Sequence, residues 1–215
     1  EGGTQPRFSP DGRWLSFLSK RGTEEEKKKG AQVWLLDMTG GEAVKLTDLP
    51  GGVSDHAWSP DSKTLVLVAS DPDPDDEPEK KEGWKRKTRP PIVVDRYHFK
   101  EDKEGYLGNA RSHLWLFDVA ARKASQLTSG PYDDELPSFS PDGRLVAFVS
   151  RRGDDPDRGN DANVFVVEAR TGATPRALTT FPGEDGGRPA FSPDGKWVAY
   201  LQGAEVGFTA YAQQK

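Results

Sequence analysis

A four-residue turn signature that returns along the chain constrains the fold more than any other feature. The sequence Ser-Pro-Asp-Gly begins at Ser9, and the same signature begins again at Ser59, Ser140 and Ser192, after 50, 81 and 52 residues. Self-similarity with a period near 50 is typical of repeat architectures in which each repeat is one supersecondary unit. The chain is therefore a repeat of one unit of about 50 residues, and the longer step indicates an insertion of about 30 residues in the second unit.

Each unit contains four short strand-like segments. An aromatic residue precedes the turn signature, an apolar run follows it, a third run closes on an acidic residue, and a more polar fourth segment, such as Val44 to Thr47, ends at Leu-Thr or its equivalent. Runs that are apolar on both faces are expected for strands covered by neighbouring sheets. The second runs span Trp14 to Leu18, Leu65 to Val68, Leu145 to Val149 and Trp197 to Leu201, and the third span Val33 to Leu36, Leu114 to Phe117 and Val164 to Val167.

Four strands per unit at this period is the pattern of β-propeller blades. We therefore predict an all-β fold, a partial β-propeller of four-stranded antiparallel blades that fills residues 1–215. The blades are expected at about 5–47, 54–128 with an insertion at 71–112, 135–179, and 187–215, the last incomplete. Closed propellers have about four to eight blades. We thus expect the chain to be an excerpt of a longer polypeptide, or to close by association with further copies.

The turn signature has a structural explanation. Proline fixes φ for the second position of a type I turn, aspartate suits the third, and glycine supplies the positive φ that lets a twisted hairpin close. Ser62 replaces this glycine in the second unit. We expect Ser62 to adopt a left-handed conformation at a cost of about 1 kcal/mol, and we expect none of these serines or aspartates to be catalytic.

Composition excludes several classes of function. The net charge is −5 with interspersed charges, which gives no basic face for nucleic acid. The absence of cysteine excludes disulfides, thiolate metal sites and thiol nucleophiles. No apolar run approaches the length of a membrane span. We expect neither a nucleic-acid nor a membrane partner.

Catalytic and metal-binding patterns are also missing. The sequence contains no Gly-x-Ser-x-Gly elbow, no His-Glu-x-x-His and no phosphate-binding glycine loop. His56 and His113 are expected to pack or to form hydrogen bonds. Asp155, Asp157, Asn160 and Asp161 weakly resemble a calcium loop that lacks its closing glutamate, so turn capping is favoured over calcium. We expect no catalytic residue, no metal and no cofactor in this chain.

Loop lengths distinguish the two faces of the propeller. The long connections all join second and third strands, which lie on one face, whereas the short turns lie on the other. Of these long connections, Glu24 to Lys29 reads as a solvated loop tip and Asp71 to Lys87 as a charged, solvated loop. Pro90 to His113 regains aromatic and apolar residues that could fold back onto the blades. Arg96, His98 and Arg111 in this segment are our candidate substrate-binding residues.

The units resemble a known group of proteins. Pro6–Gly12 (PRFSPDG) and Pro137–Gly143 (PSFSPDG) are similar to the blades shared by TolB-type propellers and the prolyl oligopeptidase family of serine peptidases. Three insertion segments, PIVVDRYHFK at 91–100, GYLG at 105–108 and RSHL at 111–114, are similar to the insertion of acylaminoacyl-peptidase-like and dipeptidyl-peptidase-like members, as is YLQG at 200–203. TolB-type propellers generally lack this insertion.

This resemblance implies a parent hydrolase in which the propeller precedes an α/β-hydrolase domain that holds the Ser, Asp and His of the active site. The propeller would cap that site, exclude folded proteins and help to position the N-terminal end of a peptide. None of the triad positions matches a residue of this chain. The leading hypothesis is a substrate-gating and substrate-selecting propeller of a serine peptidase that cleaves short or N-terminally blocked peptides.

Two alternatives remain open. The first is a non-enzymatic TolB-like propeller that serves as a protein-interaction scaffold. The second is a propeller enzyme, such as a lactonase or glycosidase, with its site in the central channel. That enzyme would need converging carboxylates or metal ligands in the first strands, and the sequence identifies none there.

Overall fold

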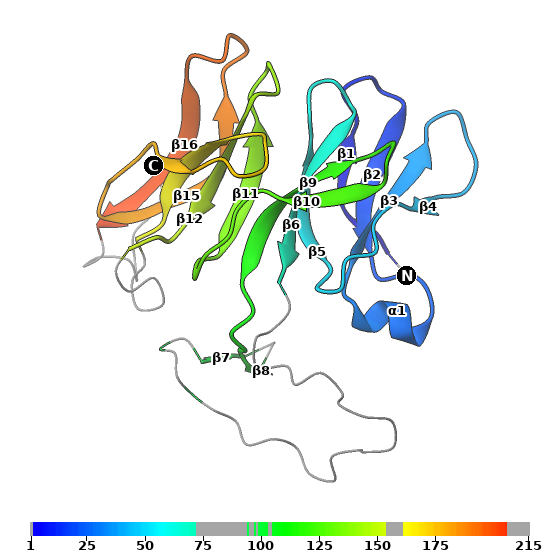
Figure 1. The fold of residues 1–215 in the computed structure, drawn as a ribbon, viewed down its shortest axis with the longest axis horizontal. Helices are drawn as coiled ribbons and strands as arrows, with labels where there is room; N and C mark the ends of the chain where they lie inside the picture. Colours follow the sequence, from blue (N-terminus) through cyan, green and yellow to red (C-terminus); the bar gives the residue numbers. More distant parts are fainter. Residues whose placement is uncertain are drawn as a thin grey trace.

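The computed structural model describes residues 2–71, 94, 97, 99–102, 105–153 and 161–205, and their regular secondary structure is almost entirely β (Figure 1). The first three sheets have four strands each and the fourth has two. Blade 1 contains β1 (Thr4–Phe8), β2 (Trp14–Ser19), β3 (Gln32–Asp37) and β4 (Val44–Lys45); blade 2 contains β5 (Val53–Trp58), β6 (Thr64–Ser70), β9 (Ser112–Asp118) and β10 (Lys123–Gln126); blade 3 contains β11 (Asp134–Phe139), β12 (Leu145–Ser150), β13 (Asn163–Glu168) and β14 (Arg176–Ala177); and the fourth sheet contains β15 (Gly183–Phe191) and β16 (Val198–Glu205).

The sheets follow one another in chain order across the view of Figure 1, from blue at the right to orange and red at the left. Within each four-stranded sheet the strands pair in the order first, second, third, fourth, and every pair is antiparallel. The first strands also contact one another between blades, β1 with β5, β5 with β11, and β11 with β15. This arrangement confirms the predicted partial propeller, with the first strands at its inner edge.

Hydrogen bonds explain the composition of the turn signature. In blade 1 the Gly12 N–H donates to the Ser9 carbonyl at 2.9 Å, which closes the turn. The Ser9 hydroxyl donates to Asp11 Oδ1 and accepts from the Trp14 N–H at 2.9 Å, and the carboxylate also accepts from the Arg13 N–H. The other three turns repeat these bonds. Serine and aspartate are thus turn-forming residues, as predicted.

Ser62 adopts the predicted left-handed conformation. Its φ is 60°, close to the values of 70° to 73° at the three glycines in the equivalent place. Its hydroxyl accepts the Asp11 N–H of the neighbouring blade at 3.0 Å. This contact between blades offsets part of the roughly 1 kcal/mol that the conformation costs a residue with a Cβ.

The Leu-Thr landmark ends the fourth strand. The Thr47 hydroxyl accepts the Val33 N–H at 2.9 Å, and the same contact recurs from Thr128 to Leu114 and from Thr179 to Val164. The hydroxyl replaces a strand carbonyl where the chain leaves the sheet. For this reason β4 ends at Lys45, two residues before the predicted limit at Thr47.

The core lies between adjacent sheets. One cluster joins blades 1 and 2 and includes Leu18, Val33, Leu65 and Phe117, and a second joins blades 2 and 3 and includes Phe148. Leu65, Val66 and Leu67 are successive residues of β6, and all three are completely buried. A strand buried on both faces is what the unbroken apolar runs predicted.

The predicted solvated loop tip at Glu24 to Lys29 is wrong in part, because the structure forms a one-turn helix, α1 (Glu24–Lys28), at that place. Thr23 and Glu26 form a reciprocal capping box, which satisfies free N–H groups at the start of the helix. Lys45 then binds Glu26 Oε1 at 3.1 Å and so attaches the helix to β4. In the described part of the chain, no helix is both long enough and apolar enough to cross a membrane.

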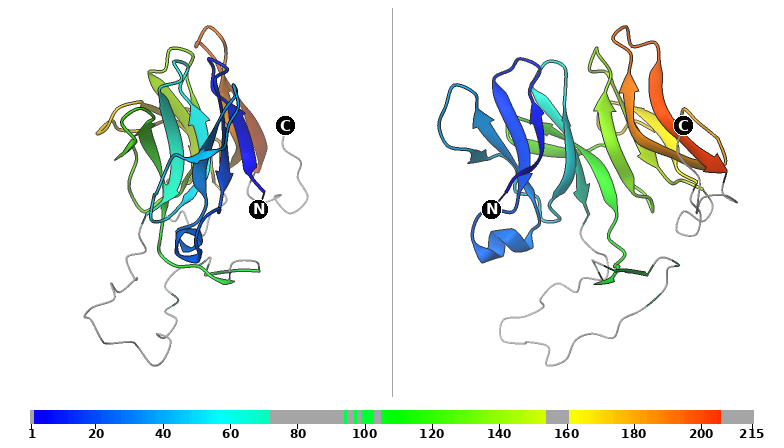
Figure 2. Two further views of the ribbon diagram at one scale, coloured as in Figure 1. Left: turned by 90° about the vertical axis from the view of Figure 1, so that its right-hand side faces the viewer. Right: turned by 180° about the vertical axis from the view of Figure 1, so that it is seen from behind.

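The insertion of blade 2 leaves the propeller at the end where α1 lies (Figures 1 and 2). Its described part includes a small hairpin of β7 (Lys100–Glu101) and β8 (Gly105–Tyr106). We expected aromatic residues to hold this segment on the blades, but Tyr97 is 61% exposed and Phe99 is 42% exposed. Those two rings therefore do not anchor it by burial. Arg96 and His98 lie outside the described residues, as do residues 154–160 of the calcium-like sequence.

Candidate functional site

The inner edge of the propeller carries a group of charged residues, Arg7, Asp55, Glu135 and Arg188, which we call the inner cluster. Each comes from the first strand of a different blade. Each of these strands contains a shift of register beside or across its charged residue, between Thr4 and Arg7 in β1 for example. Such bulges redirect side chains and are frequent beside functional sites.

One carboxylate in the inner cluster joins three blades. Asp55 Oδ1 lies 3.2 Å from Arg7 Nη2, and Asp55 Oδ2 lies 2.5 Å from Arg188 Nη2. Arg188 also donates to the Pro137 carbonyl of blade 3. The Asp55 side chain is only 10% exposed, whereas Arg7 and Arg188 are 31% and 26% exposed. Two partly exposed guanidinium groups therefore share one buried carboxylate, and their combined charge is positive.

Glu135 completes the inner cluster from blade 3. Crowding by the surrounding protein raises the pKa of its carboxyl group, and the neighbouring carboxylates of Asp133, Asp134 and Asp55 act in the same direction, whereas Arg151 opposes them. Glu135 is nevertheless exposed to solvent, so its carboxyl group is accessible beside the two arginines. The inner cluster thus offers two partly exposed guanidinium groups to an anionic group of a ligand, beside the carboxyl groups of Asp55 and Glu135.

A serine and a histidine lie side by side in the core of blades 1 and 2, but they do not form a catalytic pair. The Ser16 hydroxyl donates to the Arg7 carbonyl at 3.0 Å and accepts from Trp58 Nε1 at 2.9 Å. Because a hydroxyl has one hydrogen, the 2.8 Å contact with His56 requires the imidazole Nε2 to donate. His56 therefore cannot accept the Ser16 proton, and both residues are fully buried.

His56 is held neutral by its surroundings. Burial lowers the pKa of its imidazole to about 4, the positive charges of Arg7 and Arg188 act in the same direction, and Asp55 opposes them. Its Nδ1 has no hydrogen-bond partner among the described residues. The prediction of a packing and hydrogen-bonding role for His56 fits this geometry.

Arg111 lies at the base of the insertion. Its Nη1 binds Asp133 Oδ2 at 2.9 Å, and its carbonyl accepts the Asp71 N–H at 2.7 Å. His113 also contributes, with Nδ1 at 2.7 Å from Asp71 Oδ2 and Nε2 at 3.0 Å from the Gly130 carbonyl. These contacts fasten together the two ends of the insertion, and they give Arg111 a structural partner that the sequence did not predict. Its predicted binding role stays a prediction.

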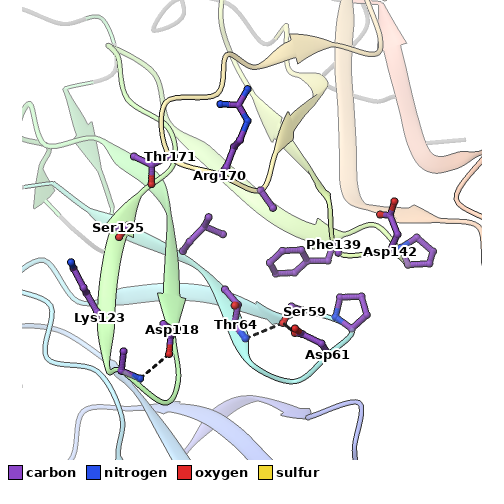
Figure 3. Close-up of a pocket in the computed structure, with 16 residues that line it drawn as sticks. Ser59, Asp61, Thr64, Asp118, Lys123, Ser125, Phe139, Asp142, Arg170 and Thr171 are labelled. Carbon is purple, nitrogen blue, oxygen red and sulfur yellow. Dashed lines mark hydrogen bonds between the residues drawn. The ribbon is translucent and has the colours of Figure 1, made fainter.

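A cleft of about 720 Å³ lies between blades 2 and 3 on the face that carries the short turns (Figure 3). Its wall includes Phe139, which occupies the place that the larger ring of Trp58 fills between blades 1 and 2. The carboxylates of Asp61 and Asp142 accept hydrogen bonds within their own turns. Across the ranges that the structure describes, no three histidine or acidic side chains gather to hold a metal.

Sequence reasoning missed the inner cluster for a physical reason. A strand that alternates regularly reveals which side chains share a face, but a bulge breaks that alternation at the inner cluster. Gln5 and Leu136 have φ values of 50° and 53° at two of these bulges. Glutamine and leucine rarely adopt a positive φ, so the sequence does not predict a bulge at either position. Nothing in the spacing of Arg7, Asp55 and Arg188 therefore showed that they meet.

Comparisons with known proteins agree with this architecture, although no protein-family model matches the chain. It is 34% identical over 166 residues to the uncharacterised peptidase YuxL of Bacillus subtilis, covering 76% of this chain and 24% of that protein. The Pyrococcus horikoshii acylaminoacyl peptidase superposes with a TM-score of 0.62 at 18% identity, over 100% of this chain and 30% of that chain. A putative TolB of Agrobacterium tumefaciens superposes with a TM-score of 0.58 at 20% identity, over 94% and 56%.

The chain thus spans about a quarter of the length of YuxL. The two structural likenesses show the fold. The sequence similarity to YuxL shows that a peptidase is among the relatives of the chain. The chain is a partial β-propeller that resembles the propellers of the prolyl oligopeptidase family of peptidases, and its blades also resemble those of TolB.

Proposed function

We propose that this propeller gates and selects substrates for a serine peptidase that acts on short or N-terminally blocked peptides. In this proposal an α/β-hydrolase domain of the same polypeptide supplies the catalytic residues. The propeller admits peptides to it and excludes folded proteins. The similarity to YuxL and the likeness to acylaminoacyl peptidase support the peptidase context.

The observation that carries the selecting role is the pair of partly exposed guanidinium groups in the inner cluster. Arg7 and Arg188 are both partly exposed, and they share the single carboxylate of Asp55. A peptide with a blocked N-terminus keeps one terminal charge, the C-terminal carboxylate. Guanidinium groups bind carboxylates through strong, charge-assisted hydrogen bonds. The inner cluster is therefore suited to holding the C-terminal end of such a peptide.

The proposal predicts that Arg188→Ala changes selectivity by substrate terminus. In the full polypeptide, KM for an N-acetylated peptide with a free C-terminal carboxylate should rise about tenfold, the equivalent of about 1.4 kcal/mol of lost binding. KM for the C-terminally amidated peptide should change little, because it lacks the charge. Steady-state kinetics on the matched pair of peptides measure this ratio.

Arg144→Ala serves as the control, because Arg144 is an exposed arginine beside the turn of blade 3, with its side chain 86% exposed. It should leave both KM values unchanged. Equal changes for the two peptides in Arg188→Ala would mean that Arg188 acts on the structure and not on the peptide carboxylate.

A TolB-like interaction scaffold is the second candidate function. The observation that favours it is the likeness to the putative TolB, of which the chain covers 56%. A scaffold would bind a protein partner and would need no hydrolase domain. If the full polypeptide shows no peptidase activity but retains a protein partner in a pull-down experiment, this alternative is favoured.

A further inference from the structure

A buried carboxylate without a partner lies where blade 4 begins. Asp185 in β15 is 0% exposed, and neither of its carboxylate oxygens has a hydrogen-bond partner in the part of the chain that is described. An isolated buried carboxylate is costly unless a cation neutralises it or a proton binds to it. We therefore searched the surroundings of Asp185 for a group that could neutralise its negative charge.

Blade 3 shows how an equivalent carboxylate is neutralised. Asp134 of β11 pairs with Ser150, as Asp185 of β15 pairs with Gln202, and Asp134 is also 0% exposed. Arg152 lies two residues beyond Ser150, and its Nη2 binds Asp134 Oδ1 at 2.8 Å. The Arg152 guanidinium also lies over three aromatic rings, at 5.0 to 5.3 Å from their centroids.

The fourth sheet, β15 and β16, has no arginine at the position equivalent to Arg152. The residue two positions beyond Gln202 is Ala204, so the position that holds arginine in blade 3 carries no charge. The missing positive charge and the unpaired carboxylate thus occur in the same blade. A bound cation would take the place that Arg152 fills in blade 3.

Oxygen atoms of blade 3 adjoin Asp185. The Asp185 N–H donates to the Ala162 carbonyl at 2.7 Å, and Ala162 is flanked by Asp161 and Asn163. Asn163 Nδ2 donates to Asp161 Oδ1 at 3.0 Å, and Asn163 Oδ1 accepts from the Thr179 hydroxyl at 3.2 Å. Burial raises the pKa of the Asp185 carboxyl group, the Asp161 carboxylate acts in the same direction, and the nearby Thr179 hydroxyl lowers the pKa. That hydroxyl gives its one hydrogen to Asn163 Oδ1, so the Asp185 oxygens gain no hydrogen bond from it.

We propose that Asp185 and Asp161, with neutral oxygens of the β13 end of blade 3, bind a calcium ion at the junction of blades 3 and 4. Calcium takes six to eight oxygen ligands from carboxylates, amide and backbone carbonyls and water, so two carboxylates are sufficient acidic ligands. The ion would join β15 to the start of β13 at Asn163. Its ligand Asp185 lies three residues before Arg188 of the inner cluster.

The test is calcium binding and its effect on thermal unfolding. The purified protein is treated with EDTA and then titrated with CaCl₂ by calorimetry, and its melting temperature is measured with and without calcium. We expect one calcium ion per chain. At calcium concentrations about 100-fold above Kd, the melting temperature should rise by roughly 5–10 °C.

Three variants locate the site. Asp185→Asn and Asp161→Asn should each lose most of the calcium-dependent rise. Glu168→Gln should keep it, because Glu168 is an exposed acidic residue at the far end of β13. Two results would overturn the proposal: no calcium binding by the wild-type protein, or a rise that persists in both aspartate variants. In the first case, a more stable Asp185→Asn protein at neutral pH would show that the buried carboxyl group of Asp185 costs stability and is not compensated by a cation.

Discussion

Asp55→Asn should lower the free energy of unfolding by about 3 kcal/mol. The substitution keeps the shape of the side chain but removes the negative charge that Arg7 and Arg188 share. Two guanidinium groups would then face each other across a neutral amide. Since Arg7 and Arg188 are both partly exposed, water can solvate their charges when the carboxylate is removed. The expected loss of stability is therefore at the lower end of the range for a broken buried ion pair. Urea denaturation at neutral pH measures the change.

Glu168→Gln is the matched control for charge removal. Glu168 pairs with Arg170 at the surface, where their side chains are 58% and 67% exposed. Exposed ion pairs contribute about 0–1 kcal/mol, so this variant should unfold close to the wild type. A similar small loss in Asp55→Asn would show that the network of three blades contributes little to stability.

The wild-type protein should lose about 2 kcal/mol of stability between pH 7 and pH 5 through His56 alone. The pKa of the buried imidazole is lowered from 6.5 to about 4, so the unfolded chain binds a proton at a higher pH than the folded chain. The stabilisation by neutral His56 is thus complete above pH 6.5 and is lost as the pH falls toward 4. Urea denaturation at a series of pH values measures this slope.

His56→Gln isolates the contribution of this residue. An amide can still donate to Ser16, but it does not titrate, so the variant should lack the pH dependence between 6.5 and 4 that the wild type shows. The groups that face His56 are Arg7, Asp55 and Arg188, and all three remain in the variant. The turn carboxylates, such as Asp11 and Asp142, have lowered pKa values and therefore act in more acidic solution. Parallel pH profiles for the two proteins would contradict a buried neutral His56.

The fold could be predicted because each unit repeats the same turn and the same apolar strand pattern. Pro10, Asp11 and Gly12 specify a turn by their own conformational preferences, and Ser9 closes it with short-range hydrogen bonds. The apolar run of β6 has no polar face, and this pattern requires a sheet on each side. Four copies about 50 residues apart, with one insertion in the second, then leave few architectures other than a propeller.

The sites were less predictable, because they depend on contacts between blades. Arg188 and Asp55 are 133 residues apart in the sequence, and only the stacking of blades brings them together. Among the described residues, Asp185 has no hydrogen-bond partner, whereas Asp134 at the equivalent place is neutralised by Arg152. The capping box of α1, in contrast, could have been predicted from the sequence, because Glu26 follows Thr23 by three residues. It was missed because the segment was interpreted from its charge pattern alone.

The most direct test of the proposed function is hydrolysis of N-acetylated peptides of increasing length by the full polypeptide and by this chain alone. We predict that the full polypeptide cleaves short blocked peptides, loses this activity with a serine-directed inhibitor, and does not cleave folded proteins. The 215-residue chain should cleave none of them. Cleavage by this chain alone, or a full polypeptide without peptidase activity, would contradict a selecting propeller that serves a separate catalytic domain.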